Sequence, residues 1–384
     1  MSMLSIDQCD LDEFRSVVEV PTELGEYPYA DSVAHGAVVY DSAGLRPQLA
    51  DPVAARSIRA EIADVLHDGP GIVVFRAAFE PEVVRPVTDA FFAMIADQHA
   101  RGIASGDHYA KPGANDRVWN AIEKLAVTDP GAFVDYYSND MLALAAVSWL
   151  GPHYQISSQV NCVNPGGEAQ RPHRDYHIGF MTDPVASEYP AHAHRLSAAL
   201  TLQGAVAHCE MPVESGPTLY LPHSQKYELG YLAWRRPEFI DYFAEHRVQV
   251  PLRTGDVVFF NPALFHAAGS NRTADVRRIA NLLQISSAMG RTMETIDTTR
   301  MTLAVYDALV AARAGGLADH RVDHVVTACS EGYAFPTNLD RDPPLGGLTP
   351  PAPSDTLRRA LAEGWPVDRL AGALADHADR RRSH

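Results

Sequence analysis

Residues 255–266 read Gly-Asp-Val-Val-Phe-Phe-Asn-Pro-Ala-Leu-Phe-His, and this stretch indicates how the chain folds. A Gly-Asp pair forms a turn signal, four apolar residues follow, and an Asn-Pro pair marks a second turn. A short apolar run between two turns is typical of a buried strand. The stretch therefore predicts a strand, a tight turn, and His266 at the edge of the next strand.

The same sequence pattern extends from about residue 154 to residue 290. Short apolar runs alternate with turn-forming Gly, Pro, Asn and Ser residues, and several short strands at this spacing indicate an antiparallel sandwich or barrel. The predicted strands cover residues 154–163, 196–206, 218–221, 248–252, 257–260 and 278–286. We therefore predict a mainly β core with flanking helices, an α+β class.

Helical patterns lie on both sides of this core. Pro81 falls in the first turn of one predicted helix, and the others cover residues 118–126, 140–150, 301–313, 355–361 and 367–374. Residues 1–60 contain scattered prolines and predict an irregular N-terminal wrap, and residues 71–75 predict a buried strand. The predicted organisation is this wrap, a core domain over 61–290, and a helical extension over 291–384. The extension packs either on the core or on a partner subunit, which leaves a homodimer open.

The composition excludes several classes of protein. The chain has 384 residues, 46% of them hydrophobic, and a formal net charge of −16, which argues against binding to nucleic acid through its phosphates. The four cysteines show no paired spacing, so neither a disulfide framework nor a zinc knuckle is expected. Without a long apolar run or a basic N-terminal leader, we expect a cytoplasmic protein that acts on a small molecule and binds no membrane.

Residues 170–177, Gln-Arg-Pro-His-Arg-Asp-Tyr-His, carry the first chemical signal. In an extended chain, side chains two residues apart point the same way, so His173 and Asp175 can present an imidazole and a carboxylate to one point. His266 is a suitable third ligand. Two histidines and one carboxylate form the metal-binding face of non-haem iron sites, with positions left for a cosubstrate and oxygen.

Arg277 follows His266 by eleven residues. It has the same strand phase as Ile279 and Leu283, so we expect its side chain to point into the core, with Arg278 at the surface. A buried guanidinium is costly unless it meets an anion, ideally a carboxylate in bidentate geometry. The distal carboxylate of 2-oxoglutarate would be such an anion.

This combination of His-x-Asp, a distant His and an Arg eleven residues later resembles the phytanoyl-CoA dioxygenase family of iron- and 2-oxoglutarate-dependent oxygenases. Residues 214–224 and 266–273 are similar to two further motifs of that family, and the resemblance covers roughly residues 70–290. It implies a double-stranded β-helix (jelly-roll) core. It also implies that His173, Asp175 and His266 bind iron(II) and that Arg277 binds 2-oxoglutarate.

Further cosubstrate contacts are expected from Gln159 and Asn161, on the strand before the metal motif, and from Thr273 in the distal-His motif. The chain departs from the family where the usual Trp-His-Gln-Asp reads Pro-His-Arg-Asp, at residues 172–175. This departure suggests a different substrate pocket. Asp175 itself distinguishes the chain from family halogenases, which lack this carboxylate, and favours hydroxylation or another oxidation such as desaturation.

The resemblance implies that 2-oxoglutarate and O2 become succinate and CO2 while an unactivated C–H bond of a small organic molecule is hydroxylated. Two alternatives stay open from the residues alone. One is a cupin-like metalloenzyme that does not use 2-oxoglutarate, and the other is a non-catalytic binding or sensor protein of the same fold.

Four basic residues precede the predicted barrel and allow two interpretations. They form a solvated face, which the sequence favours, or they contact an anionic substrate such as a CoA thioester. The four are Arg101, Lys111, Arg117 and Lys124.

Overall fold

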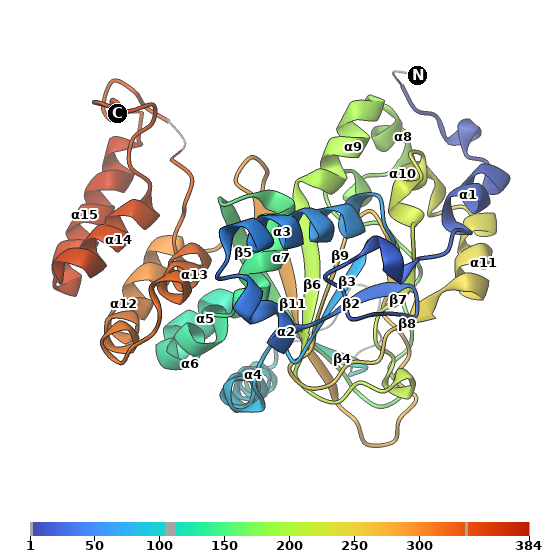
Figure 1. Cartoon of the computed structure of the whole chain (residues 1–384), viewed down its shortest axis with the longest axis horizontal. Coiled ribbons are helices and arrows are strands. Elements are labelled where there is room, and N and C mark those ends of the chain that lie inside the picture. The colour runs from blue at the N-terminus through green and yellow to red at the C-terminus, as the bar shows by residue number, and fades with distance from the viewer. Residues whose placement is uncertain (1–2, 104–112, 335–336, 384) are drawn as a thin grey trace.

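The computed structural model describes residues 3–103, 113–334 and 337–383, and Figure 1 shows two β-sheets with helices around them. In the larger sheet β2 and β3 run parallel and the other neighbouring strands are antiparallel. Its order is β1 (Ser32–Ala34), β2 (Ala37–Asp41), β3 (Ile72–Arg76), β9 (Val257–Phe260), β6 (Thr201–Ala207), β11 (Arg278–Ser287), β5 (Tyr154–Val163) and β4 (Asn115–Val118). The smaller sheet contains β10 (Phe265–Ala267), β7 (Leu219–Leu221) and β8 (Val248–Gln249).

Strand β11 is buried on both of its faces. Ile279, Leu283 and Ile285 point to one side, where they join the large apolar core formed with the helices. Ala280 and Leu282 belong to the opposite side, which packs toward the smaller sheet. Since side chains alternate along a strand, the face of β11 that carries Ala280 and Leu282 points into the space between the two sheets.

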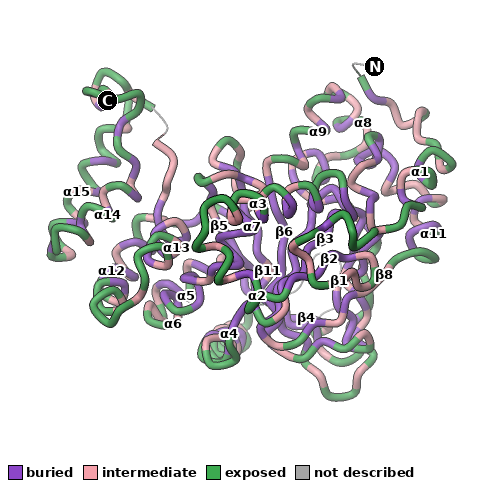
Figure 2. The backbone as a smooth tube through the Cα atoms, viewed as in Figure 1, coloured by how far each residue is buried: buried purple, intermediate pink, exposed green. Residues whose placement is uncertain are grey.

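Helices cover the outer face of the larger sheet. These are α3 (Pro52–His67), α4 (Pro81–Ala100), α5 (Ala121–Thr128), α6 (Pro130–Tyr137), α7 (Asp140–Leu150), α12 (Thr298–Ala314) and α13 (Asp319–Cys329). The apolar side chains of these helices and of the sheet form one continuous core, which Figure 2 shows as the buried interior of the molecule. The packing of α12 on α5 and α6 attaches the C-terminal extension to the core of its own chain.

The last two helices, α14 (Pro353–Glu363) and α15 (Val367–Arg380), lie at the far end of the molecule from the smaller sheet (Figure 1). They pack on each other and on α12 and α13. On the opposite side, α1 (Leu11–Val18), η3 (His177–Phe180), α8 (Asp183–Ser187), α9 (Ala191–Ala199), α10 (Gly230–Ala233) and α11 (Pro237–His246) surround the smaller sheet.

The prediction of an irregular segment over residues 1–60 is wrong. This segment contains α1, β1, β2, α2 (Ser42–Gln48) and most of α3, and β2 is part of the larger sheet. The prolines do not prevent this structure. Pro52 occupies the first turn of α3 directly after the N-cap Asp51, a position where proline loses no helical hydrogen bond.

The predicted α+β class is confirmed, but the chain is not mainly β, because helical residues outnumber strand residues in the described part. The predicted strand 196–206 begins only at Thr201, since the alanine-rich stretch before it forms α9. The loop predicted over 102–118 ends in β4, and its residues 104–112 lie outside the described part. None of the described helices combines the length and apolar character that crossing a membrane requires.

Candidate metal centre

His173 and His266 face each other on adjacent backbone segments. His173 N donates to His266 O at 3.0 Å, and His266 N donates to His173 O at 3.2 Å, which closes an isolated antiparallel bridge. The two ring centroids are 4.5 Å apart. Backbone pairing therefore brings together two histidines that are far apart in the sequence.

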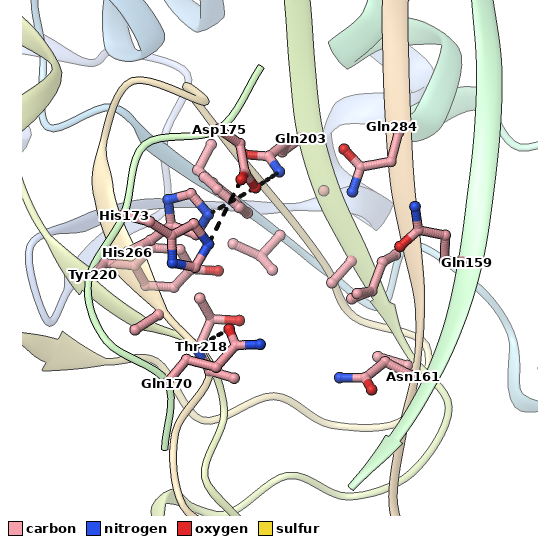
Figure 3. A pocket seen from close by; sticks show the side chains of 18 of the residues that line it. Gln159, Asn161, Gln170, His173, Asp175, Gln203, Thr218, Tyr220, His266 and Gln284 are labelled. Atoms are coloured by element: carbon pink, nitrogen blue, oxygen red, sulfur yellow. Dashed lines mark hydrogen bonds and ion pairs between the residues drawn. The ribbon is translucent and has the colours of Figure 1, made fainter. Parts of the chain in front are cut away.

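Asp175 completes the cluster. Its Oδ1 lies 3.7 Å from His173 Nε2, and its Oδ2 lies 3.4 Å from His266 Nε2. One ligand atom from each of the three residues lies within 4.8 Å of the other two, and Figure 3 shows the three side chains pointing toward one another. The predicted convergence of His173, Asp175 and His266 is therefore present in the fold.

Backbone carbonyls orient both imidazole rings. His173 Nδ1 is 3.0 Å from the carbonyl oxygen of Arg171, and His266 Nδ1 is 2.8 Å from that of Leu264. A proton on Nδ1 satisfies each carbonyl and leaves Nε2 as the electron-pair donor. Both Nε2 atoms are thus fixed toward Asp175.

Gln203 positions the carboxylate. Its Nε2 donates to Asp175 Oδ2 at 2.6 Å from strand β6. Burial opposes ionisation of Asp175, but the neighbouring His173 and His266 and the hydrogen bond from Gln203 outweigh it, so the pKa of this carboxyl lies below its ordinary value. The carboxyl is therefore held in the ionised form that a cation needs.

These residues fit a ferrous ion. Imidazole and carboxylate ligands lie about 2.0–2.2 Å from a divalent metal, which places neighbouring ligand atoms roughly 3 Å apart. The observed separations of 3.4 and 3.7 Å require only small side-chain shifts. Two histidines and one carboxylate, with no thiolate in the cluster, are the donor set of non-haem iron(II) oxygenases.

The cluster lines a cavity of about 450 Å³. Its apolar wall comes from both sheets and the segments beside them and includes Met211, Val250, Leu252, Val258, Phe260 and Leu282. Five amide side chains also line it, namely Gln159, Asn161, Gln170, Gln203 and Gln284. Figure 3 shows Gln159 and Asn161 across the cavity from His173, Asp175 and His266. The ligands thus face space for a small organic molecule.

The prediction that Arg277 points into the core is wrong. Its side chain is 44% exposed, with Nη2 3.6 Å from Asp116 Oδ2 and the guanidinium over the ring of Phe92. Arg278 is the buried residue, only 6% exposed, and it lines the cavity. Arg277 precedes the first residue of β11, and the side chains whose phase it was expected to share, Ile279 and Leu283, face the helices and not the cavity.

Arg278 donates from Nη1 to the carbonyl oxygen of Gly216. Burial lowers the pKa of Arg278 to about 10, so the side chain stays positively charged at neutral pH. Near it, the hydroxyl of Tyr220 is buried and has no hydrogen-bond partner among the described residues. Tyr220 is also the register partner of His266, so this polar group lies beside the metal cluster.

The other predicted cosubstrate residues divide into two groups. Gln159 and Asn161 line the cavity from β5. Thr273 is not among the lining residues, and its hydroxyl donates to Asn271 Oδ1 at 2.6 Å, where it stabilises a turn. His177, which continues the row of His173 and Asp175 in the sequence, lies outside the metal cluster.

Sequence reasoning missed Gln203, Gln284 and Tyr220. Each is a polar residue inside a predicted apolar strand, and this contrast was the available signal. Gln284 accepts a hydrogen bond from the hydroxyl of Tyr176, the residue after Asp175. Tyr176 and His177 both have positive φ angles, 64° and 42°, which turn the chain sharply away from the metal cluster.

Comparisons with known proteins identify the family of the chain. The model of the phytanoyl-CoA dioxygenase family matches residues 67–279. The dioxygenase trt7 of Aspergillus terreus is 30% identical over 128 residues, which is 33% of this chain and 39% of that protein. The chain thus matches well under half the length of this curated relative.

Similar solved structures include the non-heme alpha ketoglutarate dependent carbocyclase SnoK from nogalamycin biosynthesis, with a TM-score of 0.43, 20% identity, and coverage of 62% of this chain and 84% of that one. HygX from Streptomyces hygroscopicus, solved with nickel and 2-oxoglutarate bound, has a TM-score of 0.40 and 15% identity over 60% of this chain and 88% of its own. Because the family match spans more than half of the chain, the chain belongs to the phytanoyl-CoA dioxygenase family of iron- and 2-oxoglutarate-dependent oxygenases.

Proposed function

We propose that this chain is an iron(II)- and 2-oxoglutarate-dependent oxygenase that hydroxylates a C–H bond of a small organic molecule. The observation that carries the proposal is the cluster of His173, Asp175 and His266 in the wall of a cavity that also contains the buried Arg278. The cluster supplies a metal site, the cavity supplies room for a substrate, and the arginine supplies a counter-charge for a diacid cosubstrate.

We assign the two sheets to the two halves of a double-stranded β-helix. Support comes from the apolar cluster that side chains of both sheets form together, and from the antiparallel bridge between His173 and His266. In this assignment the metal ligands lie at the open end of the barrel, and the segment 177–199 lies beside them.

When bound, iron(II) with 2-oxoglutarate and O2 supplies the oxidation, in which 2-oxoglutarate becomes succinate and CO2 and one oxygen atom enters the substrate. The presence of Asp175 supports hydroxylation over halogenation, because its carboxylate occupies the position that a halide would take. Gln203 holds this carboxylate in place, and the apolar wall keeps bulk water from the reacting groups.

Arg278 is the residue that we assign to the distal carboxylate of 2-oxoglutarate. Its guanidinium is buried, no described carboxylate lies within ion-pair distance of it, and the Tyr220 hydroxyl nearby has no described partner. A bound carboxylate would satisfy both groups at once. Arg277, which the sequence favoured, is engaged by Asp116 on the outside.

The test is an anaerobic titration of the iron(II) protein with 2-oxoglutarate, followed through the weak visible metal-to-ligand charge-transfer band. We expect a saturable band in the unmodified protein. Arg278→Gln should weaken 2-oxoglutarate binding roughly ten- to a hundredfold, because a charged hydrogen bond contributes about 1.5–3 kcal/mol.

Arg277→Gln is the matched control and should leave the affinity within about twofold, since Arg277 is not among the residues that line the cavity. A larger loss of 2-oxoglutarate affinity in Arg277→Gln than in Arg278→Gln would refute the assignment of Arg278. A protein that gives no band with 2-oxoglutarate, and forms no succinate in air, would refute the proposed function itself.

A further inference from the structure

Side chains from three neighbouring strands form a row across the larger sheet. Phe260 of β9 pairs in register with Gln203 of β6, and Gln203 pairs with Gln284 of β11. Residues directly opposite each other on antiparallel strands point to the same face, and all three line the cavity. The ring centroids of Phe260 and His266 are 4.8 Å apart, and Gln203 donates to Asp175. The row therefore lies beside the metal cluster.

The carboxylate of Asp175 fixes the orientation of the Gln203 amide. An ionised carboxylate only accepts hydrogen bonds, so the amide nitrogen must face Asp175 and the amide oxygen must face elsewhere. That oxygen is buried and has no hydrogen-bond partner among the described residues. A buried oxygen without a donor marks a position where a ligand can supply one. Gln203 thus offers an acceptor in the wall of the cavity.

Gln284 offers the opposite kind of group. Its Oε1 accepts a hydrogen bond from the hydroxyl of the buried Tyr176, and Figure 3 shows its nitrogen turned toward the open part of the cavity. Tyr176 directly follows Asp175 in the chain, so the segment that supplies the carboxylate also holds this amide in place. Gln284 thus offers a donor next to the acceptor of Gln203.

The amide of Gln159, farther along the sheet, is already engaged. Its Oε1 accepts from Arg117 Nη1 at 2.6 Å, and its Nε2 lies 3.4 Å from the sulfur of Met293. Arg117 is only 8% exposed, so the solvated face that the sequence favoured is wrong for this residue. Gln159 therefore presents neither amide group to a ligand in the way that Gln203 and Gln284 do.

A hydroxyl group matches the pair of Gln203 and Gln284. Side chains directly opposite each other on neighbouring strands have Cβ atoms about 4.5–5.5 Å apart. An oxygen that donates one hydrogen bond and accepts another, each about 2.8 Å long, spans roughly 5.6 Å. A hydroxyl can therefore donate to Gln203 Oε1 and accept from Gln284 Nε2 at once, whereas a ketone oxygen can only accept.

The sheet beyond this row is apolar. Two residues farther along the three strands, Val258, Ala205 and Leu282 pair with one another and line the cavity. Ala280 occupies the next position of the same face on β11 and also lines the cavity. Each step of two residues advances about 7 Å along a strand, and the two alanines leave space above the sheet. The wall therefore offers an apolar surface that begins at the polar row.

We propose that the substrate is an alcohol with an apolar skeleton, whose hydroxyl group binds between Gln203 Oε1 and Gln284 Nε2 and whose skeleton lies on the apolar surface beyond them. This inference rests on the proposed function, because it places the substrate in the cavity of the metal cluster. Gln203 then has two tasks, since its nitrogen holds Asp175 and its oxygen orients the substrate. The C–H bonds beside the hydroxyl lie closest to the metal cluster.

The experiment uses the anaerobic iron(II) protein saturated with 2-oxoglutarate. The probes are two sets with a shared skeleton, namely cyclohexanol, cyclohexanone and cyclohexane, and borneol, camphor and bornane. Binding is followed through the shift of the charge-transfer band and through the midpoint of thermal unfolding. In at least one set, we expect the alcohol to bind roughly tenfold more tightly than the ketone, and the ketone more tightly than the hydrocarbon. Equal binding of alcohol and ketone in both sets, or binding of no alcohol, would overturn the proposal.

The double variant Tyr176→Phe/Gln284→Met removes the donor together with the buried hydroxyl that contacts it. Replacing both partners of a hydrogen bond by apolar groups is well tolerated, so we expect the fold to be kept. The affinities for the alcohol and the ketone should fall by the same factor, roughly tenfold, while the affinities for the hydrocarbon and 2-oxoglutarate stay within about twofold. Gln155→Met, on the adjacent β5 and outside the cavity, is the matched control and should change none of them.

Unchanged affinity for the alcohol in the double variant would overturn the proposal. An equally large loss of 2-oxoglutarate affinity would also overturn it, because Gln284 would then belong to the cosubstrate site.

Gln203→Met tests the acceptor and is measured at saturating iron(II). It should abolish the preference for the alcohol over the ketone and leave the affinity for the ketone within about twofold, because a ketone makes no use of an acceptor. A preference that survives in this variant would overturn the role of Gln203 in binding the hydroxyl. Absence of the charge-transfer band in the unmodified protein would instead overturn the proposed function on which the inference rests.

Discussion

Arg174 lies between His173 and Asp175 in the sequence, and its side chain points away from their cluster. It is 2% exposed, donates from Nη2 to the carbonyl oxygens of Ser224 and Tyr227, and packs over the rings of Tyr231 and Phe265. Because His173 and Asp175 are its direct neighbours in an extended segment, a fixed Arg174 fixes the direction of both ligands. These contacts account for the arginine at position 174, where the family usually has glutamine.

Arg174→Met should therefore lower both stability and metal affinity. Two buried carbonyl groups lose a charged donor, which we expect to cost about 2–3 kcal/mol in the free energy of unfolding. Urea unfolding measures the first effect, and a cobalt(II) titration measures the second. Arg171→Met, at an exposed neighbouring position, is the control and should change neither.

Gly230→Ala gives an independent check, because a Cβ at this position would lie 1.9 Å from Arg174 Cζ. It should reproduce the loss seen in Arg174→Met. If Arg174→Met keeps full metal affinity, then the Arg174 side chain is not needed to hold His173 and Asp175 in place for metal binding.

The cluster of His173, Asp175 and His266 could be predicted from the sequence because its signal is chemical. The His-x-Asp pattern in an extended segment places the two side chains on the same side of the chain, and His266 follows a strand with clear boundaries. The arginine that we assign to the cosubstrate could not be predicted in the same way. Both faces of β11 are buried. A row of apolar side chains therefore indicates a buried face, but it does not say whether that face packs on the helices or lines the cavity.

At the scale of elements, the turn before β7 supports the assigned cosubstrate site. Gly216 has a φ of 73°, and a Cβ there would lie 2.3 Å from the carbonyl oxygen of Ser270. Its own carbonyl oxygen accepts the hydrogen bond from Arg278. The turn thus needs glycine both for its left-handed backbone and for the close approach of the 266–273 segment.

Gly216→Ala should destabilise the protein by about 1–3 kcal/mol through the backbone alone, and should weaken 2-oxoglutarate binding as Arg278 loses its partner. Gly372→Ala in α15 is the contrasting control. Its added Cβ meets nothing within 4 Å, and replacing a helical glycine should stabilise by about 0.5–1 kcal/mol. Differential scanning calorimetry measures both, and equal effects of the two variants would contradict this account.

Elements with a strong local pattern could be predicted closely. The sequence predicted the bounds of β5 and β9, and α4 begins at Pro81 as expected. The N-terminal strands β1 and β2 were missed, although Val38, Val39 and Tyr40 of β2 are as typical of a strand as the residues of β3 with which they pair. Helix α9 was mistaken for part of a strand because Leu196 and the alanines around it are apolar but have no β-branched side chains.

At the scale of the whole molecule, Asp140 connects three parts of the chain. This carboxylate at the start of α7 accepts a hydrogen bond from Arg321 of α13 at 2.7 Å and lies 3.8 Å from Arg46 of α2. His324 of α13 is 3.5 Å away. The N-terminal segment, the helical layer and the C-terminal extension therefore meet at one buried charge.

Burial opposes ionisation of Asp140, but His324 and Arg321 outweigh it, so its pKa is depressed in the folded protein. A depressed carboxyl pKa stabilises the fold above the unfolded value of about 4, and this contribution is lost as the pH falls further. Asp140→Asn should lower the unfolding free energy by about 1.5–3 kcal/mol at pH 7, with the difference shrinking below about pH 4.

Urea unfolding from pH 7 to pH 2 measures this dependence. Asp376→Asn, at an exposed position on α15, should follow the unmodified protein at every pH. A deficit in Asp140→Asn that stays constant down to pH 2 would mean that the charge of Asp140 does not hold the three parts together.

The central claim is that three side chains from two distant segments bind one ferrous ion. The most direct measurement is anomalous diffraction at the iron edge from anaerobic crystals loaded with iron(II). We predict one strong peak about 2.0–2.3 Å from His173 Nε2, His266 Nε2 and an oxygen of Asp175. Iron bound at full occupancy elsewhere, with no peak among these three residues, would contradict the account.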